Sequence, residues 1–208
     1  MTLFVLLAAC AGKVPETRYY QLATQHVEPS DDGSGVTLVV EPLETESAYD
    51  DDRIVYRLTP YRLDYYDYHR WSAAPGTLIG NFLEQAFEAS GRFRTVTREA
   101  TSDAPVTLGG RVIALEEVDT SKTQWVGHVV VELTLTENAT GKVVWSQQYE
   151  ETEPLPKQSP EGLAEALSKA LERIAARALP VISDRAVQIA RSSEAAKATA
   201  SRAARSRP

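Results

Sequence analysis

Cysteine, histidine and catalytic motifs are the scarce features of this 208-residue chain. The single cysteine, Cys10, excludes an internal disulfide framework and a cysteine-based zinc cluster. The three histidines, His26, His69 and His128, are scattered, and nothing in the sequence brings them together. No phosphate-binding glycine loop, nucleophile elbow or H-E-x-x-H motif is present. The sequence therefore predicts a protein that is not an enzyme, with no catalytic residue, no metal site and no cofactor.

Basic residues are outnumbered by acidic ones, and the formal net charge of the whole chain is −7. Residues 188–208 hold five basic residues and one acidic residue, whereas the rest holds 17 basic and 28 acidic residues. An acidic body argues against nucleic acid as a partner, because phosphate contacts require basic surfaces. The basic end is interpreted as a solubilising tail, with contact to anionic lipid as the alternative.

The apolar run at the N-terminus, Leu3 to Ala9, has seven residues, far fewer than the roughly 20 that a spanning helix needs. It ends in Leu7-Ala8-Ala9-Cys10, which resembles the lipobox of bacterial lipoproteins. We therefore predict that residues 1–9 are a signal peptide and that Cys10 carries the lipid anchor. Ala11 follows the cysteine where an aspartate would signal inner-membrane retention, which favours the outer membrane. The alternative is a short apolar N-terminus with one buried cysteine.

Hydrophobic periodicity predicts one folded domain at 36–185, between a leader at 10–35 and a disordered Ala/Ser/Arg tail at 186–208. One helix is expected from Pro75 to a stop at Ser90-Gly91. A second should begin at Ser159-Pro160 and kink or end at Pro180. Period-2 alternation predicts strands at 36–40, 54–59, 61–66, 94–97, 106–118, 125–136 and 142–150. The expected fold class is α+β: a mixed, mostly antiparallel β-sheet of about six to eight strands, with two main helices packed on one face.

The most distinctive stretch, 53–71, mixes arginine with aromatic residues, the types enriched at interface hot spots. We predict that it is a partner-binding strand surface. The alternative is a rim of the core with hydroxyl groups pointing to water, and for Trp71 packing is the favoured interpretation. The predicted partner-binding residues are Arg53, Tyr56, Arg57, Tyr65, Tyr66, Arg70 and Trp71.

Two acidic features invite a chemical interpretation. The run Asp50-Asp51-Asp52 lacks the longer ligand series of a calcium loop, so a solvated turn is expected. Glu116 and Glu117 are neighbours on a predicted strand and should point to opposite faces, which makes them poorly placed to share one acid–base task.

A family resemblance rests on the same stretch. The order R-I-V-Y-R at 53–57, an aromatic run, H-R-W at 69–71 and a helix closing on S-G-R-F at 90–93 resembles the ABC-type transport auxiliary lipoproteins, the PqiC-like family. The likeness extends back to Tyr19-Tyr20-x-Leu22 and forward to about Tyr149.

The resemblance implies an outer-membrane lipoprotein facing the periplasm, held at the membrane by its lipid anchor. It implies a non-catalytic docking or tethering subunit of an ABC transport system whose partner carries the mammalian-cell-entry (MCE) domain and moves lipid between membranes. The resemblance also suggests that the protein forms a homo-oligomer. The alternatives are a periplasmic lipid-binding carrier, an envelope hydrolase and an assembly lipoprotein for another outer-membrane complex.

Overall fold

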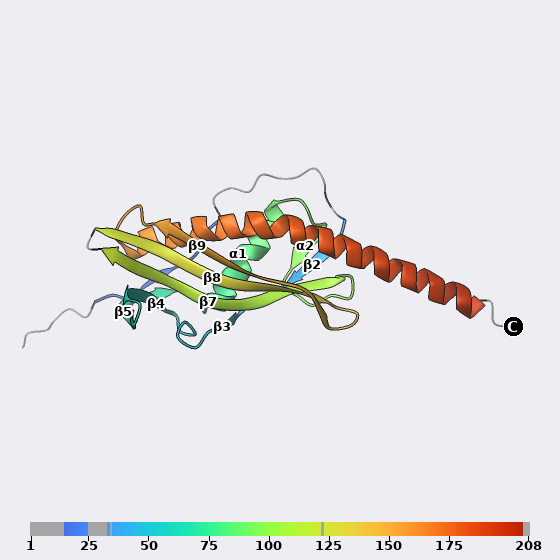
Figure 1. Ribbon diagram of the computed structural model, residues 1–208, viewed down its shortest axis with the longest axis horizontal. Coiled ribbons are helices and arrows are strands. Elements are labelled where there is room, and N and C mark those ends of the chain that lie inside the picture. Colours follow the sequence, from blue (N-terminus) through green and yellow to red (C-terminus); the bar gives the residue numbers. More distant parts are fainter. Residues whose placement is uncertain (1–14, 25–32, 34, 122, 206–208) are drawn as a thin grey trace, which may run out of the picture.

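The protein is described by a computed structural model that covers residues 15–24, 33, 35–121 and 123–205. Nine strands form one sheet, and two helices pack against it (Figure 1). The helices are α1 (Pro75–Ala89) and α2 (Pro160–Arg205). The strands are β1 (Arg18–Tyr20), β2 (Thr37–Val40), β3 (Glu44–Thr45), β4 (Arg53–Thr59), β5 (Arg62–Trp71), β6 (Thr95–Thr97), β7 (Val106–Ser121), β8 (Gln124–Glu137) and β9 (Lys142–Pro154).

Strand β7 is the central strand of the sheet. One edge pairs with β8 along its length, and β8 pairs in turn with β9, both antiparallel. The other edge receives three strands in parallel at successive points: β2 at 106–108, β3 at 111–112 and β4 at 116–118. Beyond β4 lie β5, antiparallel, and β1, parallel. The predicted mixed, mostly antiparallel sheet is confirmed. Strand β3 was not predicted, because its two residues are too few for a periodic pattern.

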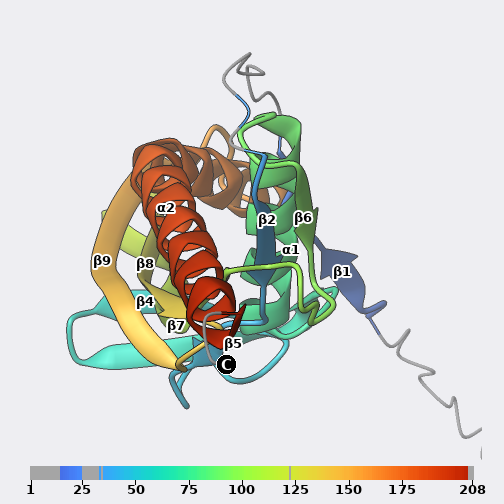
Figure 2. The same ribbon diagram turned by 90° about the vertical axis from the view of Figure 1, so that its right-hand side faces the viewer.

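Both helices cover the same face of the sheet, which curves around them in Figure 2. The alternation in β8 sends Val129, Val131, Leu133 and Leu135 into this layer, and all four are fully buried. They form one hydrophobic cluster with the apolar faces of α1 and α2. A smaller cluster on the opposite face is built around Tyr49, Val55, Ala114 and Val130. No helix of the described residues combines the length and the apolar character needed to cross a bilayer.

The predicted beginnings of both helices and the predicted end of α1 are confirmed. Pro75 lies in the first turn of α1, where its missing N–H removes no helical hydrogen bond. Gly91 follows α1 with a φ of 66°, the left-handed conformation that glycine adopts without strain. The Ser159 hydroxyl caps α2 by accepting a hydrogen bond of 3.1 Å from the Gly162 backbone N–H.

The predicted domain limits of 36 and 185 are too narrow. Strand β1 belongs to the sheet, and Tyr20 and Leu22 are part of the core. The prediction of a disordered tail is wrong for residues 186–205, because α2 continues through Pro180 to Arg205. Its apolar stripe also continues, with Ile182 and Ala186 fully buried. The alanine-rich end has high helix propensity, and the long helix bends part way along, as an internal proline favours (Figure 1). Residues 1–9 and Cys10 lie outside the described residues.

Candidate functional site

The β4–β5 hairpin exposes an unusual share of large apolar side chains. Among the described residues six such side chains are exposed: Tyr19, Leu58, Tyr61, Tyr68, Val143 and Val181. Three of them, Leu58, Tyr61 and Tyr68, belong to this hairpin and are called here the hairpin surface. Tyr61, at the turn, is 98% exposed, and Tyr19 lies on the neighbouring strand β1. Grouped exposed apolar residues indicate a contact surface, whereas single ones are ordinary.

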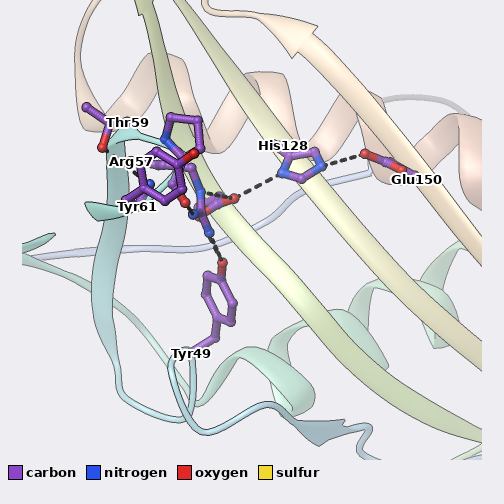
Figure 3. Close-up of polar contacts among 8 residues, drawn as sticks. Tyr49, Arg57, Thr59, Tyr61, His128 and Glu150 are labelled. Atoms are coloured by element: carbon purple, nitrogen blue, oxygen red, sulfur yellow. Dashed lines mark hydrogen bonds and ion pairs between the residues drawn. The ribbon is translucent and has the colours of Figure 1, made fainter. Parts of the chain in front are cut away.

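A buried glutamate holds the hairpin against the sheet. Glu116 of β7 is 1% exposed and accepts hydrogen bonds from Arg57 Nε (3.0 Å) and from the Tyr49 hydroxyl (2.8 Å). Arg57 also donates to the Pro60 carbonyl oxygen at 3.3 Å (Figure 3). Because Pro60 directly precedes Tyr61 in the turn, this arginine connects the buried carboxylate to the exposed end of the hairpin.

His128 extends the same network across β8. Its Nδ1 lies 3.1 Å from a Glu116 carboxylate oxygen and its Nε2 lies 3.0 Å from Glu150, so the imidazole bridges two carboxylates (Figure 3). The hydrogen bond that the imidazole donates to the Glu116 carboxylate is the main reason that the pKa of His128 is raised. Since both ring nitrogens face carboxylates, His128 is placed as an ion-pair partner and not beside a serine nucleophile, the arrangement that a triad hydrolase requires.

The pKa of Glu116 lies below its ordinary value despite its position. Burial alone would raise that pKa, but the hydrogen bonds from His128, Arg57 and Tyr49 favour the charged form more strongly. The same environment, through burial and then the neighbouring Glu116 carboxylate, raises the pKa of the Tyr49 hydroxyl to about 12. Glu116 is therefore an ionised group that depends on its cationic partners.

Glu117 points to the opposite face, as predicted, and has a different environment. It is also 1% exposed, and its Oε1 accepts a hydrogen bond of 2.9 Å from the Tyr66 hydroxyl. Burial raises the pKa of Glu117 to about 7, and the nearby Asp119 carboxyl adds to the shift. Burial also raises the pKa of Asp119. Glu116 thus has an arginine and a histidine as partners, whereas Glu117 shares its surroundings with another acid.

A pocket of about 460 Å³ lies on the face of the sheet to which Glu117 points. The pairing of β5 with β4 shifts between Tyr65 and Arg70, so that residues 66–69 leave the regular register. These residues form part of the pocket wall. Tyr56 stands beside Glu117 in the β4–β7 register, and Trp125 stands opposite Asp119 in the β7–β8 register. The pocket is thus lined by aromatic side chains of three strands and by the carboxyl groups of Asp67, Glu117 and Asp119.

The predicted partner-binding residues are mostly occupied by internal contacts. Arg53 pairs with Asp51 at 2.9 Å and lies over the Tyr65 ring, 4.4 Å from its centre. The Tyr65 hydroxyl donates to the Ala48 carbonyl oxygen at 3.0 Å. Arg70 pairs with Asp52. Asp51 and Asp52 thus serve as partners of arginines, and among the described residues no group of three or more His, Cys, Asp and Glu is placed to hold a metal ion.

Trp71 is not part of any surface. It is 1% exposed and belongs to the main core cluster, so its inclusion among the partner-binding residues is corrected here, while the packing interpretation is confirmed. Tyr56 and Tyr66 pack against each other with tilted rings, 5.0 Å between their centres, and are half-buried. The exposed large apolar residues of the hairpin, Leu58, Tyr61 and Tyr68, were absent from the predicted set. Pro60-Tyr61 at the turn between two strands was the one local signal for an exposed position.

Glutamine in place of Glu117 should flatten the pH dependence of stability. A folded-state pKa of about 7 against an ordinary value of 4.5 means that the folded protein binds more protons than the unfolded chain in this window. Wild-type stability should therefore fall as pH rises from 4.5 to 7, by ~2 kcal/mol, and Glu117→Gln should remove most of this slope. Urea unfolding at pH 5, 6, 7 and 8 measures it. The exposed Glu99→Gln variant is the control, and parallel profiles for Glu117→Gln and wild type would contradict the assignment.

Fold and site together define an α+β domain whose β4–β5 hairpin exposes three large apolar side chains. The sequence matches the family model described as ABC-type transport auxiliary lipoprotein component over residues 20–178. The chain therefore belongs to this family, whose members are auxiliary components of ABC-type transport systems. No curated protein matches the sequence.

Solved structures show the same fold at low sequence identity. Protein XCC0632 from Xanthomonas campestris is 19% identical, with a TM-score of 0.68, over 85% of this chain and 99% of that one. An uncharacterized protein is 15% identical, with a TM-score of 0.66, over 81% of this chain and 99% of that one. At such identities the likeness speaks for the architecture alone.

Proposed function

We propose that this protein is an outer-membrane lipoprotein, anchored through Cys10, that acts as a non-catalytic docking subunit of an ABC/MCE-type lipid transport system. Its periplasmic domain receives the MCE-domain protein of that system on the hairpin surface. Family membership supports a role as an auxiliary transport lipoprotein. The observation that carries the docking surface is the concentration of exposed apolar side chains on one hairpin.

The geometry of the hairpin suits a docking role. Association is favoured by contact residues that are ordered before the partner arrives, because less conformational entropy is then lost. The Arg57 hydrogen bond to the Pro60 carbonyl oxygen and the Arg57–Glu116 ion pair tie the turn to the central strand. Tyrosine is a frequent hot-spot residue, and Tyr61 and Tyr68 present their rings from this fixed frame.

A binding experiment tests this proposal. The partner used in the test is an MCE-domain protein of the same organism, and the full-length chain in detergent is immobilised. Tyr61→Ala and Tyr68→Ala together should weaken binding by ~2–4 kcal/mol, roughly 30-fold or more, because hot-spot aromatic residues contribute about this much. Biolayer interferometry measures the affinity.

The matched control is Val143→Ala, which truncates an apolar side chain that is 52% exposed but lies on β9, away from the hairpin. This variant should bind as wild type. Equal affinity of the wild type and the double tyrosine variant would rule out the hairpin surface. Absence of binding by the wild-type chain would count against the docking function itself.

A further inference from the structure

We propose that the aromatic pocket beside the hairpin surface receives a lysine or arginine side chain of the docking partner, whose cation binds the carboxyl pair Glu117 and Asp119. This inference rests on the proposed docking function and gives the chemistry of one contact within it. The occupant is a protein side chain because the pocket lies on the same hairpin as the exposed Leu58, Tyr61 and Tyr68, and Tyr68 belongs to both.

The carboxyl pair lacks the partner that buried carboxylates normally have. Glu117 Oε2 and Asp119 Oδ1 are both buried and neither receives a hydrogen bond from an N–H or O–H donor. Buried polar atoms without a partner are rare, since each costs the full desolvation of the group. On the opposite face of β7 the adjacent Glu116 has Arg57 and His128. Among the described residues, none of those lining the pocket is a lysine or an arginine, and the proposal therefore assigns the cation to the docking partner.

The pocket walls suit a cation carried on an apolar stem. Five tyrosine and tryptophan side chains line it, Tyr56, Tyr65, Tyr66, Tyr68 and Trp125, of which Tyr65 already has the Arg53 guanidinium group over its ring. The faces of such rings attract ammonium and guanidinium groups, and the strength of this attraction grows when water is excluded. Lysine and arginine place three or four methylene groups behind their charge, and these pack on aromatic surface while the head reaches a polar end. Here the polar end is the carboxyl pair.

In the free protein a proton takes the place of that cation. Burial raises the pKa of Glu117 to about 7, and the neighbouring Asp119 carboxyl adds to the shift, so Glu117 holds a proton in part of the molecules near neutral pH. The other ionisable side chains lining the pocket are those of Tyr56, Tyr65, Tyr66, Asp67, Tyr68 and His69. A cation that binds between the two carboxylates displaces this proton to solvent, so the net charge of the site is unchanged. Binding should therefore strengthen as pH rises through about 7, the pKa of Glu117.

A titration with small probes tests the site without the partner. The full-length chain in detergent is titrated with Nα-acetyl-lysine methylamide, its arginine analogue and the neutral norleucine analogue, with the Trp125 indole N–H followed by NMR. The two cations should bind about tenfold more tightly than norleucine, and about tenfold more tightly at pH 8 than at pH 6. Glu117→Gln/Asp119→Asn should remove both differences, whereas Glu99→Gln should not. Thermal unfolding verifies that each variant is folded, and the norleucine comparison needs no variant.

The outcomes separate this site from the docking proposal. Equal binding of lysine and norleucine analogues to the wild type would overturn the cation site, even if the double tyrosine variant loses the MCE-domain protein. The converse result is that the lysine analogue binds selectively to the wild type while the double tyrosine variant keeps its full affinity for the MCE-domain protein. That result would support the cation site and refute the docking surface. Vesicles containing phosphatidylethanolamine form a third arm. If their binding depends on Glu117 and Asp119 while the lysine analogue does not bind, the occupant is a lipid head group and the proposal fails.

Discussion

Replacing Arg57 with methionine should lower the free energy of unfolding by about 3 kcal/mol, because removal of one partner leaves a buried charge uncompensated. The Glu116 side chain is 2% exposed, and Arg57 supplies its arginine contact at 3.0 Å. Methionine keeps most of the apolar stem, so the loss reports the charge and its hydrogen bonds. Urea unfolding at pH 7 measures the change.

Arg53→Met is the matched control, since it lies on the same strand and also pairs with a carboxylate. Its partner Asp51 is 35% exposed, so this pair is screened by solvent and the control should lose much less stability than Arg57→Met. Similar losses in the two variants would show that the Glu116 network does not stabilise the fold specifically.

The stability difference between Arg57→Met and wild type should also depend on pH. The folded-state pKa of Glu116 lies below its ordinary value of 4.5, so its contribution is present above pH 4.5 and is lost as pH falls through the folded-state pKa. Without Arg57 that depression should shrink, and the stability gap between variant and wild type should narrow in acid. Glu116→Gln added to Arg57→Met should recover part of the loss, because the amide can still accept a hydrogen bond from Tyr49.

Replacing Trp71 with alanine should cost about 3–5 kcal/mol of stability, the usual range for removing a large aromatic side chain from a core. Trp71 is 1% exposed and lies in the main cluster, just before α1. Its backbone N–H also donates to the Asp52 carbonyl oxygen at 2.6 Å, so this position joins β5 to the loop before β4. Chemical denaturation measures the loss.

Tyr61→Ala is the companion variant, because Tyr61 is an aromatic residue of the same hairpin that is 98% exposed. It should change stability by less than ~0.5 kcal/mol, as surface substitutions usually do, while weakening the MCE-domain protein's binding. Trp71→Ala should reduce binding only in proportion to the unfolded fraction. Weaker binding by a fully folded Trp71→Ala protein, at wild-type stability, would restore this residue as a contact.

Only part of the site was accessible to sequence reasoning. The enrichment of arginine and tyrosine between residues 53 and 71 pointed to the correct hairpin, but it did not distinguish exposed from occupied side chains. Arg53 and Arg70 pair with Asp51 and Asp52, which the sequence presented as a solvated turn. The β4–β5 register shift displaces residues 66–69, and no alternation pattern anticipates such an irregularity.

The sequence by itself determined the elements whose cause is local. Alternation defined β7, β8 and β9, and Pro75 and Ser159 marked the beginnings of α1 and α2. Each of these signals acts within a few residues, through steric limits, capping or side-chain periodicity.

Only the tertiary structure decided which charges are buried and with whom. Glu116 and Glu117 are identical neighbours in sequence, yet one meets Arg57, Tyr49 and His128 while the other meets Tyr66 and Asp119. Most of these partners come from other strands and from the loop before β4, and they are brought together by strand pairing on β7. The pKa of a carboxyl group depends on what surrounds it in space, so two equal residues on opposite faces of one strand acquired opposite properties.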